Sequence, residues 1–343
     1  MGKWLYTNLY TIFTQLGTYA FPNGKPQIDW GGGNPPVIPP CTVSKTIGTG
    51  LSSTGGDSDV AFGDPLEVSI AITDNLYIID EDNIVVTMAG SPVAGAWNAS
   101  TKKVTIAAVT GNVVINVPSM TYVSSGLVSM FDGMNRGGTA GEWADVKDNT
   151  RKLTLTNCTE ASDHVEFNGT TSKAEAASGV GVNVEDTIGT IECVSEQPTQ
   201  ATDNATYPFC NMYVSGKRLI AVSIRNSATF GKNLGITQWL GSSDPAPTLG
   251  WALGDIDYTK AYISMSVDRA YINGVSLQRS TSSPGIVVHS NTTMQMFGYI
   301  AANTGNQSYR AGKMYCLRIY NRKLTSEEVA QNYKIDQKRF NLL

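Results

Sequence analysis

The stretch GKMYCLRIYNRKLTSEEVAQNYKIDQKRF, residues 312–340, decides the fold. In its first part Tyr315, Leu317 and Ile319 recur at every second position, which is the period of a β-strand. The second part carries the start signals of a helix. The sequence therefore predicts a strand that leads directly into a helix.

The helix signals lie close together. Thr325 is a favourable N-cap residue, and Glu328 follows three positions later, which completes a capping box. Leu324 before the cap can contact Val329 as a hydrophobic staple, and Val329 shares a helical face with Tyr333. This is the one helix that the C-terminal part of the sequence predicts.

Upstream of this block the patterns are those of strands. Ile263, Met265 and Val267 alternate with serines. Residues 271–275 read YINGV, and Asn-Gly is the preferred pair of a two-residue type I′ hairpin. We therefore interpret residues 124–343 as one large β domain.

A smaller β domain is predicted over residues 41–118. Apolar residues alternate with other residues over 66–72, the period of a half-buried strand. Further short apolar strands are expected at 84–88, 104–106 and 113–117, the last two flanking a turn at 109–112. Short strands at this spacing favour a sandwich.

The composition agrees with an all-β protein of several domains. The chain has 343 residues, more than one ordinary core holds, with 41% hydrophobic but only 16% charged residues. Its net charge of -4 and pI near 5.3 argue against nucleic-acid binding, which needs a basic surface. No apolar run is long enough to span a membrane, so no membrane span is expected.

Residues 1–40 are expected to form an anchoring arm that ends in a Gly/Pro linker. Leu5, Leu9, Ile12, Phe13 and Leu16 fall on one helical face, and aromatic residues add apolar bulk. So short a segment cannot bury these side chains by itself, which predicts a partner. The predicted partner-binding residues are Trp4, Leu5, Leu9, Ile12, Phe13, Leu16 and Trp30.

The cellular context follows from the N-terminal region and the cysteines. Residues 1–20 lack the unbroken apolar run and cleavage site of a signal peptide. Five scattered cysteines include no CxxC pair, so a structural zinc site is not expected. Buried free thiols in a protein that folds in a reducing cytoplasm are the favoured interpretation, and their disulfide state is left open.

Several blocks of the large domain occur in the order found in one known fold. They are GLVSMFDGMNRGG (126–138), EWADVKDNTRKLTLTN (142–157), HVEFNGTTSKAEA (164–176), TIGTIECV (187–194), RAYINGV (269–275) and the block at 312–340. Together they resemble the LamG/concanavalin A-like jelly roll. Residues 83–117 are similar to the small immunoglobulin-like (Ig-like) modules of phage and gut-bacterial surface proteins. The first resemblance implies a lectin-like jelly roll, and the second implies a spacer.

Jelly rolls also host glycoside hydrolysis, which is the enzymatic alternative for this chain. Glu192 and Glu196 flank Val194 on a predicted strand, where two repeats separate them by about 13 Å. A retaining pair needs about 5–5.5 Å, so hydrolysis is disfavoured. His164 and His289 belong to no nucleophile motif and are interpreted as structural. The protein is not expected to be an enzyme.

Two kinds of binding site remain open. Asp145, Asp148 and Asn149 lie close in sequence and Asp132 can approach them, which leaves a structural Ca²⁺ site open, although such residues more often stabilise turns. No other cofactor is expected. Glycan binding is favoured, because aromatic rings among polar side chains suit sugars. The candidate glycan-binding residues are Trp239, Asp244, Tyr299, Asn303, Tyr309 and Arg310.

An arm, a spacer and a lectin-like head resemble virion proteins of tailed bacteriophages, such as head fibres, capsid decorations or tail adhesins. The resemblance implies a structural virion protein that assembles in the host cytoplasm and is anchored to other virion proteins through its arm. A homo-oligomer, here a trimer, is expected, with surface glycans as possible ligands of the head. The alternatives are a free glycan-binding adhesin and, least favoured, a glycoside hydrolase.

Overall fold

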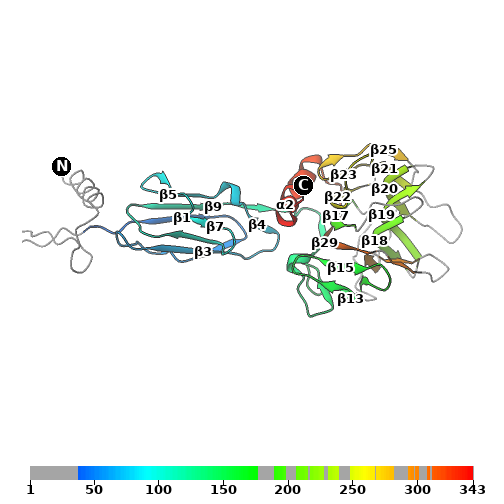
Figure 1. Cartoon of the computed structure of the whole chain (residues 1–343), viewed down its shortest axis with the longest axis horizontal. Helices are drawn as coiled ribbons and strands as arrows, with labels where there is room; N and C mark the ends of the chain where they lie inside the picture. Colours follow the sequence, from blue (N-terminus) through cyan, green and yellow to red (C-terminus); the bar gives the residue numbers. More distant parts are fainter. Residues whose placement is uncertain are drawn as a thin grey trace, which may run out of the picture.

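The computed structural model places two β-sandwiches one after the other along the chain (Figure 1). It describes residues 38–176, 189–197, 206–214, 217–227, 231–238, 248–266, 268–281, 293–296, 298–300, 307–309 and 311–342. The all-β class that the sequence predicts is confirmed. All seven predicted partner-binding residues of the arm lie outside the described residues.

The smaller sandwich, called the spacer below, consists of two four-stranded sheets. Inward-facing residues of both sheets, such as Val68 and Ile115, form its core. Strand β1 lies parallel to β9. All four strands predicted for this domain are present. The first sheet orders β1 (Val43–Ile47), β9 (Val113–Val117), β5 (Val85–Met88) and β6 (Ser91–Pro92), and the second orders β2 (Leu51–Thr54), β3 (Leu66–Ile72), β8 (Lys103–Ile106) and β7 (Trp97–Asn98).

The spacer continues past its predicted end at residue 118. Strand β10 (Ser119–Thr121) pairs with β4 (Tyr77–Ile79), and the short helix η1 (Glu81–Asn83) follows β4. This two-stranded ladder lies at the end of the spacer that meets the large domain (Figure 1). The next residues, Tyr122 and Val123, are already buried with the large domain.

The large domain, called the head below, is a sandwich of an eight-stranded and a nine-stranded sheet. The first contains β14 (Thr159–Glu160), β15 (Val165–Asn168), β29 (Ala311–Tyr320), β17 (Thr190–Glu196), β22 (Lys260–Met265), β23 (Ala270–Ile272) and β24 (Val275–Ser276), with β11 (Leu127–Asp132) also pairing with β29. The second orders β12 (Glu142–Ala144), β13 (Lys152–Thr156), β16 (Lys173–Ala176), β26 (Thr293–Met296), β18 (Thr206–Val214), β19 (Lys217–Ser227), β20 (Gly231–Gln238), β21 (Thr248–Ala252) and β25 (Arg279–Thr281). A separate ladder pairs β27 (Gly298–Ile300) with β28 (Gln307–Tyr309), and η2 (Gly133–Asn135) follows β11.

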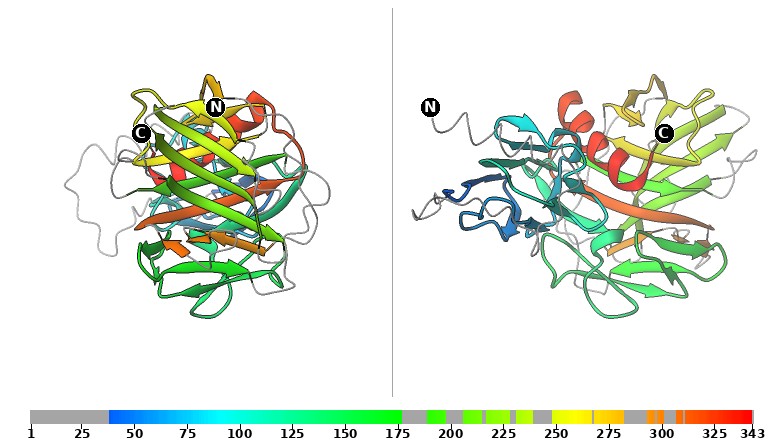
Figure 2. Two further views of the ribbon diagram at one scale, coloured as in Figure 1. Left: turned by 90° about the vertical axis from the view of Figure 1, so that its right-hand side faces the viewer. Right: turned by 60° about the vertical axis from the view of Figure 1, so that its left-hand side comes forward.

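The central strands β17, β22 and β29 of the eight-stranded sheet are buried on both faces for most of their length. The inner face of this sheet meets the second sheet in a core that includes Trp143 and Trp251. Helix α2 (Ser326–Phe340) lies over the outer face of these strands, as the right-hand view of Figure 2 shows, whereas Glu166 and Asn168 of β15 stay exposed. The strand predicted from Tyr315, Leu317 and Ile319 is confirmed as β29. Arg318 of β29 contacts Asp336 of α2 on the outer face and is therefore fully buried.

Helix α2 begins and ends as its sequence indicates. The Thr325 hydroxyl accepts a hydrogen bond from the Glu328 amide at 3.3 Å, and the Glu328 carboxylate accepts one from the Thr325 amide at 2.9 Å. Asn341, at a φ of 50°, ends the helix in the left-handed conformation that asparagine tolerates. Over the described ranges, no helix is long and apolar enough to cross a membrane.

The predicted hairpin between β23 and β24 is also confirmed. Asn273 and Gly274 have φ values of 48° and 75°, as a type I′ turn requires. A side chain at Gly274 would approach the ring of Tyr333 to 2.8 Å, so packing against α2 also favours glycine there.

Candidate functional site

The predicted glycan-binding loops lie largely outside the described residues. Trp239, Asp244, Asn303 and Arg310 belong to that part of the chain. The backbones of Tyr299 and Tyr309 lie on the paired strands β27 and β28. The predicted glycan site therefore stays a prediction.

The first predicted calcium ligand, Asp132, is occupied by protein groups. Its Oδ1 accepts a hydrogen bond from the Met134 amide at 3.1 Å. Its Oδ2 accepts from the Asn135 side chain at 2.8 Å and from the Arg339 guanidinium of α2 at 2.7 Å. Asp132 is therefore part of the contact between the sheet and α2.

The other two predicted ligands stabilise the loop between β12 and β13. Asp145 accepts hydrogen bonds from the amides of Met130 and Lys147, and it pairs with Arg151 at 2.8 Å. Asp148 accepts from the amide and the hydroxyl of Thr150. Within the described ranges, no group of three or more His, Cys, Asp or Glu side chains is arranged to hold a metal ion. A calcium site stays a prediction that a thermal shift with added Ca²⁺ or chelator would test.

The two glutamates of the glycoside-hydrolase alternative differ in their accessibility. Glu192 is fully buried beneath α2, where it accepts hydrogen bonds from Arg318 at 3.0 Å and Asn332 at 2.8 Å. Burial raises its pKa, although Arg318 opposes the rise. Glu196 is partly exposed and binds Lys313 and the Tyr315 hydroxyl, each at 2.7 Å. The two carboxyl groups therefore do not flank one substrate site.

His164 has local partners, in agreement with the structural role that the sequence predicts. Its Nδ1 lies 2.6 Å from a carboxylate oxygen of Asp163. Its ring lies against Tyr315, with 5.0 Å between the ring centroids. His289 lies outside the described residues.

A buried network of charged and polar side chains joins the spacer, the sheet and α2. We call it the junction network; its members are Tyr122, Asp132, Glu192, Arg318, Asn332, Asp336 and Arg339. Arg318 on β29 contacts Glu192 on β17 and forms two hydrogen bonds with Asp336 on α2. The nearby charges hold the pKa of Arg318 well above its ordinary value although burial acts to lower it. The network therefore fixes α2 to the sheet with paired charges.

Tyr122 connects this network to the spacer. Its hydroxyl donates to Asp336 at 2.6 Å and accepts from Arg339 at 2.8 Å, while the Arg318 guanidinium lies 4.5 Å from its ring centroid. The amide of Val123 donates to Asn332 at 2.9 Å. Leu76, Ile78 and Met120 of the spacer pack against the buried hydrophobic cluster between the eight-stranded sheet and α2. Two domains that share a core in this way have a fixed relative orientation.

An ion pair at the edge of this contact should make it sensitive to acid. Lys338 of α2 lies 3.2 Å from Asp80 of the spacer. Burial acts to raise the pKa of Asp80, but hydrogen bonds from Asn83 and Lys338 outweigh it and hold the pKa below the ordinary 3.8. The ionised carboxylate thus stabilises the fold above the ordinary pKa, and this contribution is lost as the pH falls through the lower folded value.

Asp80→Asn should therefore make the free energy of unfolding less dependent on pH in acid. We expect a smaller loss of unfolding free energy between about pH 5 and pH 3 than in the wild-type protein, as measured by urea unfolding. Asp59→Asn removes an exposed carboxylate of the spacer and is the control. An equal loss in the Asp80→Asn and wild-type proteins would contradict the assignment.

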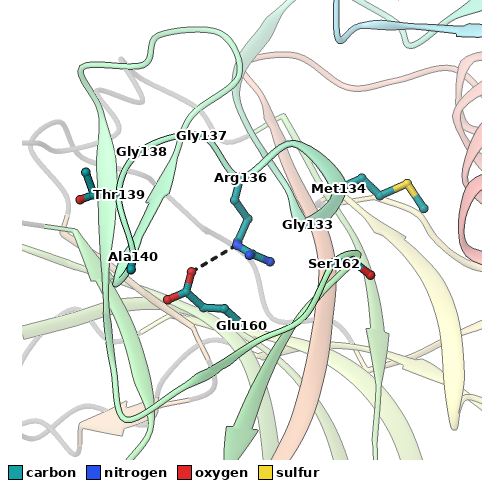
Figure 3. Close-up of a pocket in the computed structure, with 9 residues that line it drawn as sticks. All are labelled: Gly133, Met134, Arg136, Gly137, Gly138, Thr139, Ala140, Glu160 and Ser162. Carbon is teal, nitrogen blue, oxygen red and sulfur yellow. Dashed lines mark ion pairs between the residues drawn. The ribbon is translucent and has the colours of Figure 1, made fainter.

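A cavity of about 410 Å³ opens beside the N-terminal part of the head (Figure 3). It is lined by Gly133, Met134, Arg136, Gly137, Gly138, Thr139, Ala140, Glu160 and Ser162. Its volume falls within the roughly 300–1,000 Å³ that is usual for ligand sites. We call it the glycine-lined pocket.

Arg136 and Glu160 point toward one another across this pocket (Figure 3). The Arg136 Nε lies 3.4 Å from a carboxylate oxygen of Glu160. The other carboxylate oxygen accepts from the Gly141 amide at 2.8 Å, and the Arg136 Nη1 donates to the Ala161 carbonyl. About a quarter of each side chain remains exposed, 22% for Arg136 and 26% for Glu160. A ligand can therefore reach both charges.

The loop that lines the pocket depends on glycine. Gly137 and Gly138 have φ values of 58° and 77°, which residues with a side chain rarely adopt. Without Cβ atoms, their backbone amide and carbonyl groups can approach a ligand closely. The Gly-Gly pair belongs to the block 126–138 and is the one feature of the sequence that points to this loop. No feature of the sequence points to the pairing of Arg136 with Glu160.

No protein-family model matches the sequence, and no match to a curated protein is found. Among solved structures, the chain is similar to Trypanosoma rangeli sialidase in complex with sialic acid, with 16% identity and a TM-score of 0.41, over 64% of this chain and 34% of that chain. It is also similar to a botulinum neurotoxin type C structure, described in terms of cell entry through two ganglioside molecules, with 10% identity and a TM-score of 0.45, over 61% and 51% of the two chains. The chain thus spans about a third of the sialidase and half of the toxin chain. Likenesses at this level carry no argument about activity or ligand.

Proposed function

We propose that this protein is a non-catalytic structural protein that displays a glycan-binding head on a rigid spacer. The finer proposal is that residues 1–40 anchor it in the virion of a tailed bacteriophage. In this arrangement the spacer holds the head away from the particle surface, and the head contacts glycans of the host. The protein would assemble as a closed homo-oligomer, for which we propose a trimer.

The junction network is the observation that carries the proposal. Charges are rarely buried at a domain boundary unless they are paired, because their desolvation costs several kcal/mol each. Here the Arg318–Asp336 pair is fully buried between the sheet and α2 of the head, and Tyr122, which directly follows the last strand of the spacer, is buried with it and bonds to Asp336. A protein that only had to tether its head would need no such contact. A fixed spacing and orientation suits a displayed binding domain.

The buried state of Glu192 supports a non-catalytic head. A carboxylate that is paired with Arg318 beneath α2 is not available to a polysaccharide. The glycine-lined pocket instead offers groups that can bind a polar ligand without reacting with it. The head is therefore proposed to bind and not to turn over its ligand.

Deletion of residues 1–30 tests the anchoring proposal. We expect the truncated protein to keep its thermal unfolding transition, because residues 41–342 supply the buried cores of the spacer and the head, and to be lost from purified phage particles. The measurement is the amount of the protein in particles, compared with that in the infected-cell lysate.

Two outcomes would contradict the anchoring proposal. If the truncated protein still loads onto particles at the wild-type level, the arm is not the anchor. If the full-length protein is absent from particles but binds glycans in solution, the chain is a free adhesin.

A further inference from the structure

We propose that the glycine-lined pocket binds an uncharged sugar and discriminates against acidic sugars. This inference deepens the proposed glycan-binding function and rests on it. It names the site, between the β11–β12 loop and the β14–β15 hairpin, and it names the ligand class. None of the residues that line this pocket was among the glycan-binding residues predicted from the sequence.

The charge balance of the pocket decides the ligand class. Arg136 alone would attract an anion, but Glu160 lies 3.4 Å from it and carries the opposite charge. An acidic sugar that approaches the guanidinium is therefore repelled by the carboxylate. An uncharged sugar can use both groups, because neighbouring hydroxyls can donate to Glu160 and accept from Arg136.

The surrounding charges do not change this balance. Glu142, which lies next to the loop, is paired with Lys152 at 2.8 Å. Asp163 is in contact with His164 at 2.6 Å. Asp132, below the loop, is paired with Arg339 at 2.7 Å. Glu142 and Asp132 thus each have a cationic partner, and the charge left on Asp163 is negative, which also disfavours an acidic sugar.

The remaining surface of the pocket also suits a sugar. The exposed backbone of Gly137 and Gly138 offers polar groups, and Thr139 and Ser162 add hydroxyls at the margin. Met134 is 40% exposed, but its side chain points away from Arg136 and Glu160 (Figure 3), so the apolar surface that it offers lies at the rim of the pocket. A polar site with one apolar contact matches a molecule that has both kinds of surface.

Glu160→Gln tests the ligand class through a change of preference. Glutamine keeps an oxygen that can accept from the Gly141 amide but removes the charge that balances Arg136. We expect about tenfold weaker binding of uncharged oligosaccharides, because a charge-assisted hydrogen bond is lost. Sialylated versions of the same oligosaccharides should bind more tightly to Glu160→Gln than to the wild-type protein.

The experiment uses the full chain on an array of matched neutral and sialylated oligosaccharides, followed by calorimetry on the strongest neutral ligand. Glu175→Gln is the matched control, since Glu175 forms a similar ion pair with Lys173 at 2.7 Å but does not line the pocket. Thr139→Trp is a second variant, which places a large ring at an exposed position of the loop that lines the pocket. It should abolish binding without lowering the thermal unfolding midpoint.

The possible results separate this inference from the proposed function. Tighter binding of the sialylated forms by the wild-type protein would overturn the ligand class. Binding of neutral sugars that neither Glu160→Gln nor Thr139→Trp changes would place the site elsewhere and leave the proposed function intact. If the full chain binds no oligosaccharide on the array, the glycan-binding function fails together with the inference.

Discussion

Arg318→Met should lower the free energy of unfolding by about 3–5 kcal/mol, the usual cost of breaking a buried ion pair by removing one partner. Arg318 is fully buried and contacts two carboxylates, Glu192 and Asp336. Without it these groups must either bind protons or remain as unpaired charges, and both states are unfavourable in the fold. Urea unfolding at neutral pH measures the effect.

Lys313→Met is the matched control for this substitution. Lys313 lies on the same strand and is also paired with a glutamate, Glu196, but the pair is partly exposed to water. A pair of this kind contributes about 0–1 kcal/mol. If Arg318→Met costs no more than Lys313→Met, the buried charges do not hold the junction together.

Tyr122→Ala should uncouple the spacer from the head and lower stability by about 3–5 kcal/mol, the usual cost of removing a buried aromatic side chain. The substitution removes the ring that Arg318 covers and the hydroxyl that links Asp336 to Arg339. We expect two separate unfolding transitions in place of one, and faster proteolysis within residues 118–125. Calorimetry and limited digestion with a protease of broad specificity, proteinase K, followed by mass spectrometry measure the two effects.

Tyr258→Ala separates loosening of the junction from loss of stability. Tyr258 is also fully buried, but it belongs to the inner core of the head and has no part in the junction network. Its loss should destabilise the head without new cleavage at residues 118–125. If both variants are cleaved there at the same rate, Tyr122 has no special role in coupling the domains.

The predictions that rested on neighbouring residues were confirmed. The alternation over 66–72, the Asn-Gly hairpin and the capping box at Thr325 each depend on a few consecutive positions. Their period or turn chemistry is set by the backbone geometry of one element. For this reason the all-β class and the strand-to-helix order were predictable from the sequence.

The junction network was not predictable, because its partners lie far apart in the sequence. Tyr122 bonds to a residue 214 positions away, and Arg318 to one 126 positions away. Asp132 shows the same limit. The sequence left it open as a ligand of a calcium site beside Asp145 and Asp148, and its contact with Arg339, 207 positions away, had no local signal. Nothing local to Asp132 distinguishes an ion-pair partner from a metal ligand.

The glycine-lined pocket was predictable only in part. Its glycines belong to a block whose order along the chain was recognised, and their positive φ values explain why glycine is required there. The pairing of Arg136 with Glu160 depends on the β14–β15 hairpin folding back toward the loop. The loop was therefore visible in the sequence, but its chemistry was not.

The distance distribution between the spacer and the head tests the central claim most directly. Spin labels can be placed on Val85→Cys in the spacer and Val275→Cys in the head, two exposed positions. Cys158 is replaced by serine, because it is the native thiol that is not fully buried. The other native thiols are buried, which disfavours labelling; they are Cys41, Cys193, Cys210 and Cys316. For Cys210, burial also raises the pKa to about 12. When the labelled full chain is assembled with an excess of unlabelled chain, so that only distances within one chain are measured, pulsed electron resonance should give a single narrow distance, which Tyr122→Ala broadens. A broad distribution in the protein with Tyr122 intact would contradict the claim that the junction network holds the head at a fixed position on its spacer.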